Sequence, residues 1–129
     1  MEQKVKTILV VEDDKALNQA VVFKLKRKGY NPVSVFTAED AMKVLEEGAD
    51  KIDFIWLDIL LPGMSGLDFL KLVRENKKLK DKKVAIVSVS GGYEKQKEAE
   101  DLGVVDYIIK SNYDLNDIIE IVSKDINNK

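Results

Sequence analysis

Carboxylate, hydroxyl and ammonium side chains stand at the ends of short apolar runs in this sequence. Glu12, Asp13 and Asp14 follow residues 7–11, Asp58 follows 54–57, Ser88 follows 84–87 and Lys110 follows 107–109. Oxygen ligands without histidine or cysteine favour a hard cation such as Mg²⁺. A cation, a lysine and a hydroxyl together suit the oxygens of a phosphoryl group, and an aspartate can be the nucleophile that accepts it. These residues can share one chemistry only if the fold brings the ends of the runs together.

The chain contains no histidine and no cysteine, which excludes several classes of site. A Ser-His-Asp triad, imidazole or thiolate metal ligation, a disulfide framework and phosphohistidine on this chain are all impossible. Any histidine in the mechanism must come from another protein. The formal net charge of −2 gives no overall electrostatic footprint for nucleic acid. Because no aromatic residue interleaves with the lysines of residues 74–83, we expect no direct nucleic-acid contact there either.

No stretch of the sequence approaches the ~20 apolar residues of a membrane span. The polar start of the chain, residues 1–6, is not that of a signal peptide. We therefore expect a cytoplasmic protein that does not enter a membrane.

The apolar runs alternate with helical patterns. Each run is too short for a helix and lacks polar alternation, which is typical of a strand buried on both faces of a parallel sheet. The predicted strands are 7–11, 33–36, 54–57, 84–87 and 107–109, and the predicted helices are 15–28, 38–48, 66–77, 93–102 and 114–126. Gly29, Gly48 and Gly103 predict left-handed helix ends, and Asp114 predicts a helix N-cap.

This repeat of strand and helix predicts an α/β fold with a doubly wound parallel sheet, right-handed crossovers and helices on both faces. A chain of 129 residues fits one domain, which we place at residues 1–129 because no linker or repeat divides it. The element count fits a flavodoxin-like or a Rossmann-like sheet. Ligands of such sheets bind beyond the carboxyl ends of the strands, so the polar residues at those ends are expected to converge on one crevice.

Four segments, in order and spacing, resemble the receiver domains of bacterial two-component response regulators. They are residues 8–14, 56–66, 84–88 and 106–110, and the most specific element is Asp-x-x-x-Pro-x-Met-x-Gly from Asp58 to Gly66. The resemblance covers essentially the whole chain. It implies a flavodoxin-like (βα)5 fold with five parallel strands in the order 2-1-3-4-5.

The resemblance also implies a role for each matching residue. Asp58 matches the phosphoacceptor, and Asp13 and Asp14 match the acidic pair that holds Mg²⁺, for which Mn²⁺ is a substitute. The other matches are the backbone carbonyl of Leu60 as a further metal ligand, Ser88 as the switch hydroxyl, Lys110 as the phosphoryl-binding lysine and Tyr107 as the aromatic residue whose rotamer follows that hydroxyl. Glu12 matches a less direct neighbour of the acidic pair.

The expected partners follow from the same resemblance. The phosphoryl donor would be a histidine kinase or a histidine phosphotransfer protein, with Val22 and Phe23, which lie off the apolar stripe of their helix, as candidate docking contacts. Phosphorylation would change the face built from the fourth and fifth strands and helices, within residues 84–126. That face would then bind an output protein or drive dimerisation of a monomer. We expect no enzymatic activity beyond self-phosphorylation and self-dephosphorylation.

One departure from the family pattern and three alternative functions need to be considered. Ser111 follows Lys110 where the family usually has a proline, commonly after a cis bond, so we expect a trans bond and a different loop shape. A pseudo-receiver scaffold would act without phosphorylation. A flavodoxin-type electron carrier would need a neutral, hydroxyl-rich loop where Glu12 to Asp14 stand. A phosphatase with an aspartate nucleophile would place a second carboxylate at Leu60.

Overall fold

The computed structural model describes residues 4–89 and 92–128. Its five strands form one parallel sheet in the order β2-β1-β3-β4-β5, so the predicted flavodoxin-like fold and strand order are confirmed. The strands are β1 Thr7–Val11, β2 Asn31–Val35, β3 Phe54–Leu57, β4 Lys83–Ser88 and β5 Asp106–Ile109.

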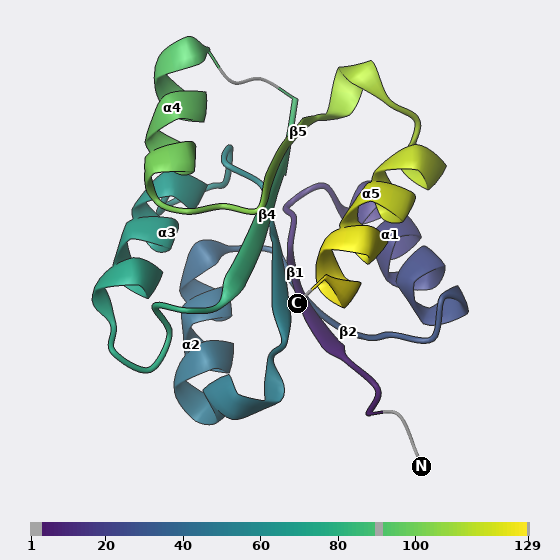
Figure 1. The fold of residues 1–129 in the computed structure, drawn as a ribbon, viewed down its shortest axis with the longest axis horizontal. Coiled ribbons are helices and arrows are strands. Elements are labelled where there is room, and N and C mark those ends of the chain that lie inside the picture. The colour runs from purple at the N-terminus through teal and green to yellow at the C-terminus, as the bar shows by residue number, and fades with distance from the viewer. Residues whose placement is uncertain (1–3, 90–91, 129) are drawn as a thin grey trace.

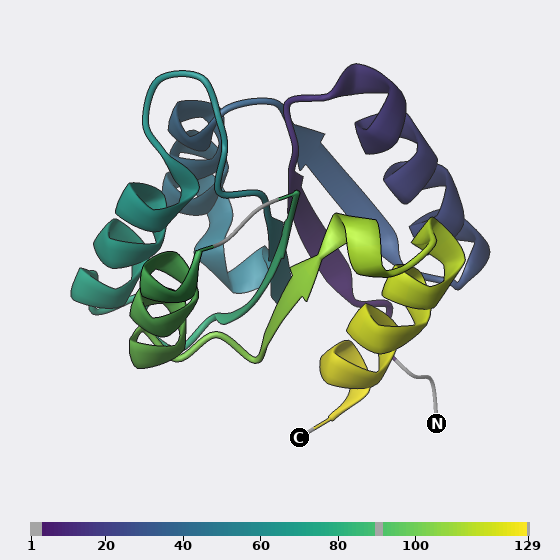
Figure 2. The same cartoon turned by 90° about the horizontal axis from the view of Figure 1, so that it is seen from above.

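Helices cover both faces of this sheet. Figure 1 shows the sheet nearly edge-on, with α2, α3 and α4 on one side and α1 and α5 on the other, and Figure 2 shows the same layers from above. The helices are α1 Lys15–Arg27, α2 Ala38–Gly48, α3 Gly66–Glu75, α4 Tyr93–Asp101 and α5 Leu115–Asn127. Short 3₁₀ helices follow α2 at Ala49–Lys51 and β5 at Lys110–Asn112.

The two helical layers share the central strands. Within β3, Phe54 and Trp56 pack in the core under α1 and α5, whereas Ile55 and Leu57 pack in the core under α2, α3 and α4. Every residue of β3 is buried, which explains why this run shows no polar alternation. Burial of such side chains, at roughly 1.5–3 kcal/mol for each large one, holds the strand ends in place.

Four local details of the structure test the predictions made from the sequence. β2 begins at Asn31, earlier than predicted, because Pro32 is tolerated in an edge strand. Gly29 and Gly103 adopt the predicted positive φ. The same prediction for Gly48 is wrong, since its φ is −167° and the chain continues into the following 3₁₀ helix. The predicted cap is confirmed, because Asp114 accepts a hydrogen bond from the backbone of Asp117 at 2.9 Å.

None of the helices within residues 4–89 and 92–128 combines the length and the apolar composition that a membrane crossing requires.

Candidate functional site

Asp58 lies at the carboxyl end of β3, and both of its carboxylate oxygens have partners. The backbone N–H of Asp58 donates to Val11 at 3.0 Å, which fixes the residue against the end of β1. Ser88 Oγ, at the end of β4, donates to Asp58 Oδ1 at 3.0 Å. Lys110 Nζ, just after β5, lies 3.0 Å from Asp58 Oδ2. The Asp58 residue is only 3% exposed, so these polar partners compensate its burial.

The loop from Asp58 to Ser65 leads from β3 into α3 and closes tightly on itself. The backbone N–H of Leu60 donates to Asp58 Oδ1 at 3.1 Å, and the N–H of Gly66 donates to the carbonyl of Ile59 at 2.8 Å. A Cβ at Gly66 would lie 2.2 Å from the carbonyl oxygen of Asp58, so no larger residue fits. Ser65 caps α3 by accepting from the backbone of Asp68. This close approach is the physical reason for the glycine in the sequence motif.

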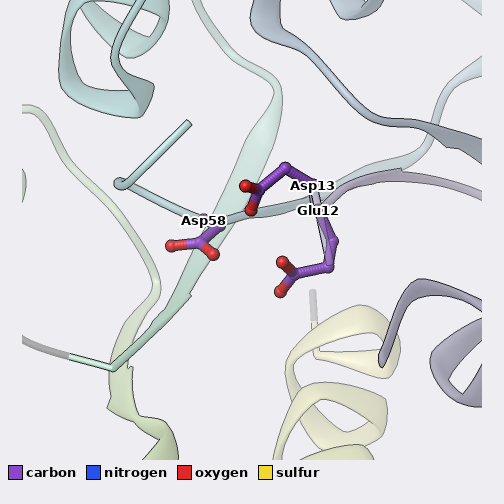
Figure 3. Close-up of side chains that lie close together, drawn as sticks. All are labelled: Glu12, Asp13 and Asp58. Atoms are coloured by element: carbon purple, nitrogen blue, oxygen red, sulfur yellow. The ribbon is translucent and has the colours of Figure 1, made fainter. Parts of the chain in front are cut away.

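Three carboxylates gather beside this loop. One oxygen atom from each of Glu12, Asp13 and Asp58 lies within 4.8 Å of the others. Figure 3 shows Glu12 and Asp13, from the end of β1, beside Asp58. Glu12 is fully buried, and Asp13 is exposed. Because like charges at this separation repel one another, a cation stabilises the arrangement, and the oxygen-only donor set suits a hard divalent ion.

Asp14 occupies a different place from the one expected. Its carboxylate accepts a hydrogen bond from the backbone N–H of Leu17 at 3.0 Å and caps α1, with the side chain exposed to solvent. The acidic group therefore contains Glu12 where the sequence led us to expect Asp14. The physical reason is that the Asp14 carboxylate already serves as the N-cap of α1, whereas Glu12 directly follows the last residue of β1.

Glu12 and Lys110 form the tightest ion pair of the site, with Lys110 Nζ 2.6 Å from Glu12 Oε1. Burial raises the pKa of Glu12 to about 7, although the hydrogen bonds from Lys110 and from the backbone of Asp14 oppose the rise. Burial works against the charge of Lys110, but the hydrogen bond to Glu12 and the charge of Asp58 outweigh it, so the pKa of Lys110 is raised. Lys110 thus stays cationic between two acidic groups.

The other predicted residues lie around this centre. Tyr107 is half-buried against the core beneath α2, α3 and α4, and burial together with the charge of Asp58 raises its pKa. The Leu60 side chain is exposed. On α1, Val22 is half-buried and Phe23 is 58% exposed. The bond from Lys110 to Ser111 is trans and lies in the 3₁₀ helix after β5.

Asn18 is a site-supporting residue that the sequence patterns did not single out. It is buried in α1, and its side-chain amide donates to the carbonyls of Glu12 at 3.0 Å and Val35 at 3.2 Å. These bonds hold the residues that end β1 and β2. A signal was present, because Asn18 precedes Val21 and Leu25 at helical spacing on the buried stripe of α1.

Comparison with known proteins gives a consistent result. Residues 8–123 match the family described as response regulator receiver domain. The phosphate regulon transcriptional regulatory protein PhoB of Klebsiella pneumoniae is 36% identical over 103 residues, which cover 80% of this chain and 44% of that protein. The chain therefore spans less than half the length of this relative.

Two solved structures of response regulators have a fold similar to that of this chain. The phosphorylated cyanobacterial phytochrome response regulator RcpA superposes with a TM-score of 0.81 at 29% identity, covering 94% of this chain and 91% of that chain. The Mn²⁺-bound response regulator Rcp1 superposes with a TM-score of 0.78 at 26% identity, covering 92% and 90%.

Proposed function

This chain belongs to the response regulator receiver domain family, and from that membership we propose that Asp58 accepts a phosphoryl group in a Mg²⁺-dependent reaction. The observation that carries the proposal is the buried Asp58 carboxylate between the Ser88 hydroxyl and the Lys110 ammonium, with two more carboxylates alongside. An oxygen of Asp58 attacks the phosphorus, the bond to the donor's leaving group breaks, and an acyl phosphate forms. The hydroxyl and the ammonium then bind the new phosphoryl oxygens.

For the metal we propose Glu12, Asp13 and Asp58 with the backbone carbonyl of Leu60, and Mg²⁺ with Mn²⁺ as its substitute. The three clustered carboxylates fit such an ion because their donors are all oxygen. We assign Glu12 in place of Asp14, since Asp14 caps α1. When bound, the cation neutralises charge on the transferring group.

For the response we propose a local switch. A phosphoryl group adds charge and acceptor oxygens, so the Ser88 hydroxyl turns from Asp58 toward it and Lys110 pairs with it. Tyr107 changes its rotamer, and the face formed by β4, α4, β5 and α5 changes shape. That face would bind an output protein or a second copy of the chain. The domain then works in the cytoplasm as a switch, with no activity beyond its own phosphorylation and dephosphorylation.

The phosphoryl donor is proposed to be a histidine kinase or phosphotransfer protein that docks on α1 at Val22 and Phe23. In support, Phe23 is exposed, and the guanidinium carbon of Arg27 lies 5.7 Å from the centroid of its ring. Phe23 also lines a hollow of about 500 Å³ between α1 and α5. Phe23→Ala should slow transfer from the donor protein and leave phosphorylation by acetyl phosphate at the wild-type rate. Equal transfer rates from the donor protein would refute the docking site.

Incubation with Mg²⁺ and acetyl phosphate, followed by intact mass measurement, tests the central proposal. We expect a gain of one phosphoryl group that Asp58→Asn abolishes. Asp50→Asn, a change of the same kind at an exposed position, should leave the gain intact. A wild-type chain that gains no phosphoryl group at any Mg²⁺ concentration would identify a pseudo-receiver scaffold instead.

A further inference from the structure

We propose that Glu39, at the start of α2, is a positioning residue that holds the loop between β3 and α3 and thereby sets the affinity of the metal site. The inference rests on the proposed function, because it concerns the loop that supplies Asp58 and the carbonyl of Leu60. The carboxylate Oε2 of Glu39 accepts a hydrogen bond from the backbone N–H of Met64 at 3.1 Å. This bond joins two elements that are remote from each other in the sequence.

The middle of the loop packs on the core through the partly buried Leu61 and Met64, but it has few hydrogen bonds to hold its backbone. Asp58 is bonded to β1, and Gly66 is bonded back to Ile59. Between them, Pro62 and Gly63 are exposed to solvent. Within the described residues, the bond from Met64 to Glu39 is the hydrogen bond that ties residues 61–64 to another element.

Glu39 is itself well anchored. Thr37 caps α2 by accepting from the backbone of Asp40 at 3.0 Å, and the neighbouring Ala38 and Ala41 are fully buried. A carboxylate in the first turn also interacts favourably with the helix dipole. The base of the Glu39 side chain is therefore a fixed point beside the loop.

The close approach of Gly63 to the same carboxylate also shows the fit. Its φ of +74° is a left-handed conformation that favours glycine. A Cβ there would lie 2.7 Å from Oε2 of Glu39, the same oxygen that accepts from Met64. The loop conformation and the reach of the Glu39 carboxylate are thus matched to each other.

The expected effect on Mg²⁺ affinity follows from the fraction of molecules in which the loop holds the binding conformation. Leu60 lies in this loop and donates its backbone N–H to the fixed Asp58, so a displaced loop moves the Leu60 carbonyl relative to Asp58. When only a fraction of molecules holds the competent loop, the apparent dissociation constant rises in inverse proportion to that fraction. Substitution of a residue that hydrogen-bonds to a metal ligand typically weakens metal binding by about 10-fold to 100-fold. For a solvent-exposed bond that acts through the loop we expect roughly 10-fold weaker Mg²⁺ binding in Glu39→Ala.

The experiment compares Glu39→Ala, Glu39→Gln and the control Asp40→Ala. Asp40 lies in the same first turn, is also exposed, and loses the same charge on substitution. Mg²⁺ affinity is measured by calorimetry, and the rate of phosphorylation by acetyl phosphate is measured over a range of Mg²⁺ concentrations. In Glu39→Ala the half-saturating Mg²⁺ concentration should rise while the rate at saturation is retained. Glu39→Gln should behave like the wild type, since its amide oxygen accepts the same hydrogen bond.

The possible outcomes distinguish a failure of the Glu39 inference from a failure of the proposed function. A wild-type chain that neither binds Mg²⁺ nor gains a phosphoryl group contradicts the proposed function itself. A functional wild type with unchanged Mg²⁺ affinity in Glu39→Ala overturns the positioning role alone. If Asp40→Ala or Glu39→Gln weakens Mg²⁺ binding as much as Glu39→Ala does, the effect is due to charge, and the positioning role of Glu39 is also overturned.

Discussion

At the scale of single residues, the geometry distinguishes Glu12 from Asp14. Glu12 is fully buried and reaches Lys110 at 2.6 Å while one of its oxygens stays within 4.8 Å of the carboxylates of Asp13 and Asp58. The carboxylate of Asp14 is already occupied by the first turn of α1. Replacing the carboxylate with an amide should therefore affect Mg²⁺ binding differently at the two positions.

We predict that Glu12→Gln weakens Mg²⁺ binding by at least about 10-fold, whereas Asp14→Asn changes it by less than about twofold. Glutamine keeps the shape of the side chain but replaces one carboxylate oxygen of the cluster with an amide nitrogen, which cannot bind a cation. Asparagine keeps the helix cap, because its side-chain oxygen accepts the same bond. Calorimetric Mg²⁺ titration of the two variants measures the difference. The opposite order, with Asp14→Asn the more damaging, would restore the acidic pair that the sequence resemblance suggested.

The predictable site residues are those whose position follows directly from a strand end. Asp58, Ser88 and Lys110 each close an apolar run, and neighbouring parallel strands bring such ends together whatever the details of packing. The place of Glu12 was not predictable in the same way, because it depends on which residue ends the extended backbone and which begins the helix cap. Glu39 was beyond sequence patterns, since its contact joins a helix to a distant loop.

At the scale of elements, the runs buried on both faces were the reliable signal. β1, β3 and β4 appear where continuous apolar residues predict them, because central strands contact helices on both sides. The edge strand β2 was less predictable, since it includes Pro32 and its residues are not fully buried. Helix ends depend on local backbone angles, which is why Gly48 differed from Gly29.

The last turn of α5 is held by two lysines from other parts of the chain. Lys6 donates to the carbonyl of Ile126 at 3.1 Å, and Lys83, at the start of β4, donates to the carbonyl of Asp125 at 3.4 Å. The Asp125 Oδ2 atom is buried and has no hydrogen-bond partner among the described residues. Burial and the neighbouring carboxyl group of Asp106 raise the pKa of Asp125 to about 7.

A raised carboxyl pKa makes the contribution of Asp125 to stability largest in acid. In the unfolded chain the carboxyl ionises near its ordinary pKa of 3.8, whereas in the folded chain it stays protonated until about 7. The stabilisation is therefore fully present below the unfolded value and is lost as pH rises toward the folded one. Between about pH 4.5 and about pH 7.5 the wild type should lose about 1 kcal/mol relative to Asp125→Asn, after allowance for solvent screening.

Urea unfolding followed by the fluorescence of the single tryptophan, Trp56, measures this difference. Asp50→Asn, at an exposed position, serves as the control and should track the wild type across the pH range. A constant difference between wild type and Asp125→Asn at all pH values would show that Asp125 does not titrate in this window.

At the scale of the whole molecule, the helices differ in how firmly they attach to the sheet. α5 buries four residues, Ile118, Ile119, Val122 and Ile126, whereas α4 buries only Ala99. The Lys71–Glu98 ion pair that links α3 to α4 is exposed to solvent and adds little. A helix with so little buried surface opens at low free-energy cost. α4 also follows β4, which ends in Ser88. It is therefore the element on which a change at Asp58 should act most strongly.

Hydrogen exchange with and without beryllofluoride, a mimic of the bound phosphoryl group, tests this route of communication. We predict that amide exchange across α4 changes by roughly 10-fold, which corresponds to about 1.4 kcal/mol, while exchange across α2 changes by less than about twofold. The difference is expected from the proposed switch, in which the Ser88 hydroxyl would leave Asp58 for the phosphoryl mimic. Ser88→Ala, which still carries Asp58 and Lys110, should bind beryllofluoride and leave α4 unchanged. An equal response in all helices, or an α4 response that persists in Ser88→Ala, would mean that the signal does not travel through this hydroxyl.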